Sequence, residues 1–286
     1  MIYYVEKDPQ TGFIWKLYKH KLVVKIEFME STDTVVLEWT FSPPDFFEEQ
    51  INLKRDDYEL VIGSGKIEAR IEAEAHEKNP AIRDYIDRNL NNRFLGVQLL
   101  THKPYELSKP SMYRVYPDGH KDYFIHAESG VLLLSVGPAD LTHIDKDGNV
   151  IRDTKAERIR KKKSLADLAE KYGRADTTVA SLLKSYKMAV TDPNNELVHL
   201  YEIRDALDKK FKGKELTCKT LNISSRQWSR LGLLANDETL KQGRHRGQSL
   251  GKLRNATKSE LEEARNIARG FVEAYLEDIE LHDTGV

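Results

Sequence analysis

The segment NDETLKQGRHRGQ, which begins at Asn236, contains the residues best suited to chemistry on a phosphate group. Arg244, His245 and Arg246 are consecutive and lie between two glycines, which would let the backbone approach a ligand closely. The planar fork of arginine donors matches phosphate oxygens. Neighbouring cations disfavour an imidazolium, so His245 would stay neutral and able to accept a proton. The alternatives are solvated arginines and an asparagine that simply ends a helix.

A second candidate arginine lies in the segment 194–211, which has the apolar period of a helix. Arg204 projects from the middle of its apolar face, where an unpaired charge would be costly. We expect Arg204 either to form an interhelical ion pair, with Asp237, Glu238 or a glutamate of the last helix, or to reach into a functional cleft. Asp205 would orient the groups of the same network or accept hydrogen bonds from them.

The composition is that of a globular, water-soluble protein. Of the 286 residues, 40% are hydrophobic and 32% are charged. The longest apolar run, VLLLSV at 131–136, is far shorter than the roughly 18 residues that cross a bilayer. The start of the chain lacks the pattern of a secretory signal, and Cys218 is the single cysteine, so we expect a cytoplasmic protein without disulfides. No group of residues has metal-ligand spacing, so we expect neither a metal nor a cofactor.

Charge is distributed unevenly along the chain. Residues 1–150 carry 18 Lys and Arg against 25 Asp and Glu, whereas residues 151–286 carry 27 against 21. Within the second half, residues 212–254 hold ten basic and three acidic side chains. Such a basic band is expected of a protein that binds nucleic acid. Alternatively, acids of the last helix neutralise the band: Glu273, Glu277, Asp278 and Glu280.

The first half is predicted to form a sheet, because apolar and charged residues alternate with a period of two. In 66–75, the residues on one face are Ile67, Ala69, Ile71 and Ala73. The other predicted strands are 21–28, 34–41, 58–63, 112–116, 122–127 and 131–136, with turns at 117–120 and 146–149. One helix over 81–94, capped by Asn79, interrupts them.

From about residue 155 the period becomes that of helices. The predicted helices are 155–173, 177–189, 194–211, 224–241 and a last helix that begins with a capping box from Thr257 to Glu260. We therefore predict an α+β protein. A mainly antiparallel, β-rich domain covers residues 1–152, and an all-α helical bundle covers residues 153–286.

Two other stretches resemble nucleic-acid-binding elements. Residues 164–187 have the helix, turn and helix of a helix-turn-helix, with Thr177 and Thr178 at the start of the second helix. Any helical hairpin has the same pattern, and a DNA-binding regulator would need these threonines on a basic face. The basic run RIRKKK at 158–163 is typical of a solvated helix start.

The order of segments in 164–281 is a helical pair, HLYEIRDAL, SRLGLLAND, GRHRG and a long amphipathic helix. This order resembles the HEPN superfamily, and most closely its ApeA-like branch, whose members often carry an LY…E helix, an AN pair and an RHG element. The matching residues are Leu200, Tyr201 and Asp205, then Ala235 and Asn236, then Arg244 and His245. The chain departs from the usual pattern because its arginine and histidine are adjacent, not four to six residues apart, and because the helix acid is an aspartate.

The resemblance implies a bundle of four to five helices that is usually dimeric. Active members of the superfamily are metal-independent ribonucleases of toxins, phage-defence systems and CRISPR effectors. By that resemblance, His245 would transfer the proton and Arg244 would stabilise the phosphorane, while Arg246, Asn236 and Arg204 would contact RNA phosphates and Asp205 would support them. The expected partners are RNA, a second copy of the chain and a protein trigger for the N-terminal domain. A non-catalytic HEPN module that binds RNA, nucleotide or a protein remains the alternative, and a helix-turn-helix regulator is a third.

Overall fold

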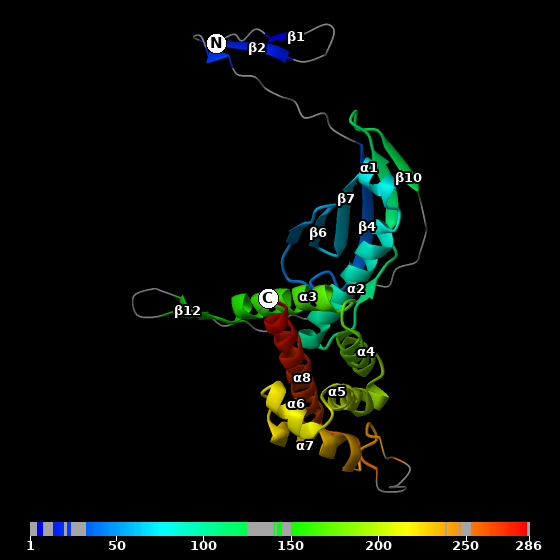
Figure 1. The fold of residues 1–286 in the computed structure, drawn as a ribbon, viewed down its shortest axis with the longest axis vertical. Coiled ribbons are helices and arrows are strands. Elements are labelled where there is room, and N and C mark those ends of the chain that lie inside the picture. Colours follow the sequence, from blue (N-terminus) through cyan, green and yellow to red (C-terminus); the bar gives the residue numbers. More distant parts are fainter. Residues whose placement is uncertain are drawn as a thin grey trace.

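The chain is an α+β protein in which a mainly antiparallel sheet precedes a group of helices (Figure 1). The computed structural model describes residues 5–7, 14–19, 22–23, 33–124, 140, 142–144, 150–237, 239–244, 246 and 253–284. The predicted fold class is confirmed. In the described residues, no helix is both long and apolar enough to cross a membrane.

The main sheet has the strand order β10-β9-β4-β7-β6-β5, with every neighbouring pair antiparallel. Its strands are β4 Thr34–Ser42, β5 Ile51–Lys54, β6 Glu59–Gly63, β7 Lys66–Glu72, β9 Ser111–Val115 and β10 Lys121–Phe124, and β8 Glu106–Leu107 pairs with the end of β4. The predicted alternation in β7 is confirmed, since Ile67, Ala69 and Ile71 are at most 1% exposed. The turn at 117–120 joins β9 to β10 as predicted.

The other described strands form two smaller sheets. β1 Val5–Lys7, β2 Ile14–Lys19 and β3 Leu22–Val23 form a three-stranded sheet, and β11 Thr142–Ile144 pairs with β12 Val150–Asp153. The predicted strand 131–136 and the predicted turn 146–149 lie outside the described residues, and only 22–23 of the predicted strand 21–28 are described.

Helix α2 (Ile82–Thr101) covers one face of the main sheet, after the short helix α1 (Ala73–Lys78). The prediction that Asn79 caps α2 is wrong. Asn79 ends α1, and α2 begins three residues later, after Ala81. Pro80 accounts for the end of α1, because proline disfavours helical backbone at the residue before it. The Asn79 carbonyl accepts from the Ile82 N–H at 3.0 Å. Helix α2 also extends beyond the predicted 81–94, to Thr101.

Helix α3 (Thr154–Tyr172) lies between the sheet and the remaining helices (Figure 1). It crosses α2 at Gly96 so closely that a Cβ atom there would lie 2.3 Å from the Leu165 carbonyl oxygen. On α3, Ala166 packs in the core under the sheet, whereas its neighbour Leu165 packs in the core of the helices. The change from strand to helix falls at Asp153, as predicted, and independent folding of 1–152 and 153–286 stays a prediction.

The remaining helices pack around α5 (Glu196–Phe211) and α8 (Lys258–Thr284) (Figure 1). They are α4 Thr177–Thr191, α6 Lys214–Thr220 and α7 Ser225–Gly232, with short helical turns at Pro193–Asn195 and Leu233–Asp237. Helix α6 is missing from the sequence prediction. The predicted helix 224–241 is too long, because α7 ends at Gly232 and the next turn is widened into a π-helix.

The basic run at 158–163 is engaged within the protein. Arg158 pairs with Glu48 and Asp140, and Lys162, which is 7% exposed, pairs with the same glutamate. The two cations hold the pKa of Glu48 at about 2, against the effect of burial. Lys161 pairs with Glu273 of α8. These residues therefore join α3 to its neighbours.

Candidate functional site

The loop that carries Arg244 is tied to the end of the π-helical turn. The Arg244 backbone N–H donates to the Ala235 carbonyl at 2.7 Å, and the Gly243 N–H donates to the Leu240 carbonyl at 3.1 Å. A Cβ atom on Gly243 would lie 2.9 Å from the Ala235 oxygen. Gly243 therefore permits a close approach to the chain itself, and not to a ligand as the sequence had suggested.

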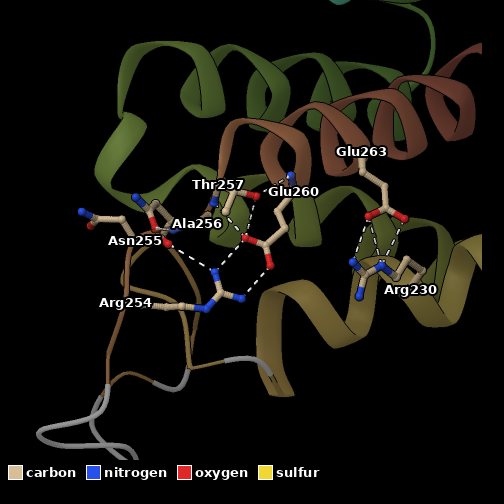
Figure 2. Close-up of polar contacts among 8 residues, drawn as sticks. Arg230, Arg254, Asn255, Ala256, Thr257, Glu260 and Glu263 are labelled. Carbon is tan, nitrogen blue, oxygen red and sulfur yellow. Dashed lines mark hydrogen bonds and ion pairs between the residues drawn. The ribbon is translucent and has the colours of Figure 1, made fainter.

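The base of this loop is held by a network at the start of α8 (Figure 2). The Lys241 N–H donates to the Arg254 carbonyl at 2.9 Å, and the Arg254 N–H donates to the Thr239 carbonyl at 3.0 Å. The Arg254 side chain forks onto Glu260 at 2.6 and 2.8 Å. The predicted capping box is confirmed, because Thr257 and Glu260 exchange hydrogen bonds of 2.8 and 3.2 Å. These donors lower the pKa of Glu260 to about 2.

The acids that partner the basic band differ from those that the sequence suggested. Glu260 binds Arg254, and Glu263 binds Arg230 with contacts of 2.9 and 3.1 Å (Figure 2). Of the four predicted acids, Glu273 pairs with Lys161 and Arg269, Glu280 pairs with Lys171, and none is seen to pair with a described residue of 212–254. The acids one and two turns into α8 face the band because α7 packs against that end of the helix.

Arg244 lies over the ring of Tyr201 on α5. Its Cζ is 4.4 Å from the ring centroid, and its Nη1 is 3.3 Å from Asp205 Oδ2. The Arg244 side chain keeps 37% of its surface exposed. Stacking and the ion pair each contribute at most about 1 kcal/mol at such exposure. Together they fix the direction of the guanidinium and leave part of it open to solvent.

Arg204 is sandwiched among aromatic rings. Its Cζ lies 4.9 Å from the Tyr201 centroid and 5.1 Å from that of the buried Trp228. Gly232 provides the space, since a Cβ atom there would lie 2.0 Å from Arg204 Nη1. In the part of the chain that the structure describes, Arg204 forms no ion pair, so the expected pairing with a last-helix glutamate is not seen. The side chains of Asp237 and Glu238, the other expected partners, lie outside the described residues.

Asp205 lies beside both guanidiniums. Partial burial raises the pKa of its carboxyl above the ordinary value, because lost hydration outweighs the attraction of Arg244 and Arg204. The predicted association of Arg204, Asp205 and Arg244 is therefore present in the structure, with Tyr201 at its centre. Tyr201 and Trp228 are absent from the predicted site. The spacing of Tyr201, Arg204 and Asp205, at i, i+3 and i+4 of one helix, was the available signal for Tyr201.

The other predicted site residues are placed differently. Arg246 donates to the Asn195 side-chain oxygen at the start of α5, ten residues before Asp205. Asn236 adjoins the Arg244 anchor through Ala235, and its buried Oδ1 has no hydrogen-bond partner among the described residues. His245 and Gly247 lie outside the described residues. The described part of the site is thus Arg204, Asp205 and Arg244 on Tyr201, with Asn236 beside them.

The helix-turn-helix candidate lies beside a groove that carries charges of both signs, with Lys210 and His282 among its basic residues. Thr177 is exposed and Thr178 is half-buried at the start of α4, where Asp176 caps the helix at 2.7 and 2.9 Å. The adjacent groove contains Asp278 and Asp283 of α8 as well as Asp176. Carboxylates at this position would repel DNA phosphates.

No protein-family model matches the chain, and neither a curated protein nor a solved structure is significantly similar to it. Among the described residues, no three His, Cys, Asp or Glu side chains gather closely enough to hold a metal ion. The functional assignment therefore depends on the geometry around Tyr201.

Proposed function

We propose that the helical part of this protein cleaves RNA without a metal ion, as its sequence resemblance to HEPN proteins suggests. The observation that carries the proposal is the placement of Arg244. Its guanidinium is directed by Tyr201 and Asp205, its backbone is anchored on Ala235, and it precedes His245 directly in the sequence. A fixed cationic donor that is next in sequence to a histidine is suited to transfer of a phosphodiester.

RNA supplies its own nucleophile for such a reaction. The 2′-oxygen attacks phosphorus and gives its proton to a base, and the 5′-oxygen leaves with a proton, so that a 2′,3′-cyclic phosphate and a 5′-hydroxyl result. In the proposal His245 takes up and returns the proton, and Arg244 stabilises the charge that develops on the phosphorane. Arg204 and Asp205 would hold Arg244 in position, and Asn236 and Arg246 would contact the RNA or the loop.

A second copy of the chain would concentrate positive charge at this site. We propose a homodimer formed through the helical part, with the two loops around Arg244 facing one groove. Sedimentation equilibrium at micromolar concentration checks this, and a monomer with and without RNA would contradict it.

The test of cleavage is incubation of the full chain with RNA labelled at both ends, in EDTA. His245→Ala is expected to lower the rate by roughly 10²- to 10⁴-fold with little loss of RNA binding. Arg244→Ala is expected to weaken both, and the rate more. Arg160→Ala is the matched control, because Arg160 is exposed on α3 and, among the described residues, hydrogen-bonds a carbonyl of its own helix and no acid. Cleavage that is unchanged in folded His245→Ala protein would refute the catalytic assignment.

A non-catalytic binding module is the second candidate. It is favoured by the fact that both described arginines of the loop already contact the protein, Arg244 through Asp205 and Arg246 through Asn195. In that case the wild-type chain binds RNA without cutting it, and the arginine variants reduce binding more than His245→Ala does.

A further inference from the structure

A polar groove lies where the main sheet, α2 and α3 meet, remote in sequence from the loop around Arg244. We name it the junction groove. Its volume is about 740 Å³, which is within the usual range for small-molecule sites. The lining residues come from β5 and its following turn, from α2, and from α3 and the turn after it: Leu53, Arg55, Tyr85, Asn89, Asp167, Glu170, Lys171, Arg174 and Ala175.

The two acids that line the junction groove, Asp167 and Glu170, pair with arginines of the protein. Arg93 is completely buried, its Nη1 lies 2.8 Å from Asp167 Oδ1, and it also pairs with Glu170. Glu170 in turn accepts from Arg55 Nη2 at 3.2 Å. Two arginines, Arg93 and Arg55, thus offset the two carboxylates, and Arg174 is left as the groove cation that these acids do not pair with.

The wall of the groove carries an exposed aromatic ring with a cation on it. Tyr85 is 44% exposed, and the Arg174 Cζ lies 5.0 Å from its ring centroid. Across the described ranges of the chain, no carboxylate is within ion-pair distance of Arg174, which is itself exposed. An accessible ring and an accessible arginine side by side form a platform for a planar group that bears negative charge.

One buried polar group also lines the groove. Asn89 is 6% exposed and hydrogen-bonds the Tyr58 hydroxyl, and the rest of its donor and acceptor capacity faces the groove. Lys171, by contrast, is engaged by Glu280 and Asp283 of α8. The groups open to a ligand are therefore the Tyr85 ring and the Arg174 guanidinium, together with the remaining hydrogen-bonding capacity of the Asn89 amide.

We propose that the junction groove binds a nucleoside mono- or diphosphate. The base stacks on Tyr85, the phosphate groups contact Arg174, and Asn89 hydrogen-bonds the edge of the base. A purely apolar ligand would leave these polar groups desolvated without partners, and a simple anion would leave Tyr85 unused. The proposal is independent of RNA cleavage, because the groove shares no lining residue with the site around Tyr201.

The test is isothermal titration of the full chain with ADP, with adenosine and pyrophosphate as separate ligands. ADP is expected to bind once per chain and at least 10-fold more tightly than either part alone. Tyr85→Ala and Arg174→Ala are each expected to weaken ADP binding by roughly 5- to 100-fold, the usual effect of removing a stacking or charged contact. Both side chains are exposed, so circular dichroism should show unchanged folding.

Two control variants locate the site. Arg88→Ala removes an exposed arginine of α2, one turn from Tyr85 and outside the groove, and should leave ADP binding unchanged. Arg244→Ala should also retain it, so failure of the cleavage proposal would not affect this result. The proposal is overturned by a wild-type chain that does not bind ADP, by pyrophosphate binding as tightly as ADP, by unchanged binding in both groove variants, or by loss of binding in Arg244→Ala.

Discussion

Gly232 offers a way to move Arg204 without removing it. A methyl group at this position would lie 2.0 Å from Arg204 Nη1 and 3.2 Å from its Cζ, far inside contact distance. The obstructed atoms are the end of a flexible side chain, so Gly232→Ala is expected to displace the guanidinium from Tyr201 and Trp228 while the backbone stays in place. The fold should therefore survive.

Two opposing contributions set the size of the effect. Loss of a partly buried guanidinium from two rings costs about 1–2 kcal/mol. Alanine in place of glycine at the last residue of α7 increases the free energy of unfolding by up to about 1 kcal/mol, because alanine has the higher helix propensity. We expect Gly232→Ala to lower the free energy of unfolding by about 0.5–1 kcal/mol. In an Arg204→Ala background nothing obstructs the methyl group, so Gly232→Ala should raise the free energy of unfolding by about 0.5–1 kcal/mol.

Urea unfolding of the four proteins in this cycle measures the coupling directly. The expected coupling between Gly232 and Arg204 is about 1–2 kcal/mol, and cleavage of RNA, if present, should fall in Gly232→Ala. An identical effect of the glycine substitution in both backgrounds would refute the described placement of Arg204.

Three further predictions concern stability. Gly96→Ala should lower the free energy of unfolding by about 3 kcal/mol or more, because the new methyl group meets the backbone of α3. Gly270→Ala, where nothing lies within 4 Å of the new methyl group, should raise it by up to about 1 kcal/mol. Thermal denaturation compares the two variants. Burial lowers the pKa of His102 from 6.5 to about 4, so the folded state binds fewer protons and loses about 2 kcal/mol of stability from pH 7 to pH 5. His102→Asn, which suits the left-handed backbone there, should remove that loss, and an unchanged pH dependence would contradict it. Glu260→Gln should lower the free energy of unfolding by about 1–2 kcal/mol at neutral pH, because the charged contact with Arg254 is lost. The pKa of Glu260 in the folded state is depressed to about 2, so the difference in stability between wild type and variant should shrink as the pH falls from 4.5 toward 2. Urea titrations measure this difference, and a constant value would refute the pairing.

The sequence predicts those features that depend on near neighbours. The alternation of Ile67, Ala69 and Ile71 identifies β7 because a strand repeats every two residues. The capping box from Thr257 to Glu260 identifies the start of α8 because its hydrogen bonds join residues three apart. Asn79 is misassigned because the short helix α1, which the sequence did not predict, ends at this residue, and α2 begins only after Ala81.

Features that depend on distant parts of the chain escape such rules. Nothing near Arg244 indicates that it lies over Tyr201, because that contact forms only once the loop returns across α5. The end of α7 at Gly232 is likewise hidden, since the following LLAND segment has no proline or glycine and the π-helical turn arises as the chain packs on α5. Glu260 and Glu263 face the basic band for the same reason of packing.

The close crossing of α2 and α3 at Gly96 restricts which segments of this protein could be transferred to another protein by recombination or by engineering. Since α3 contributes Ala166 to the core under the sheet and Leu165, Ala169 and Tyr172 to the core of the helices, a fragment that starts at Thr154 would expose Ala166. It would also lack Leu99 of α2, which belongs to the helical core. A transferable helical unit must therefore include α2, and with it the sheet that α2 covers. Recombination that respects the folded structure would move α2 and α3 together.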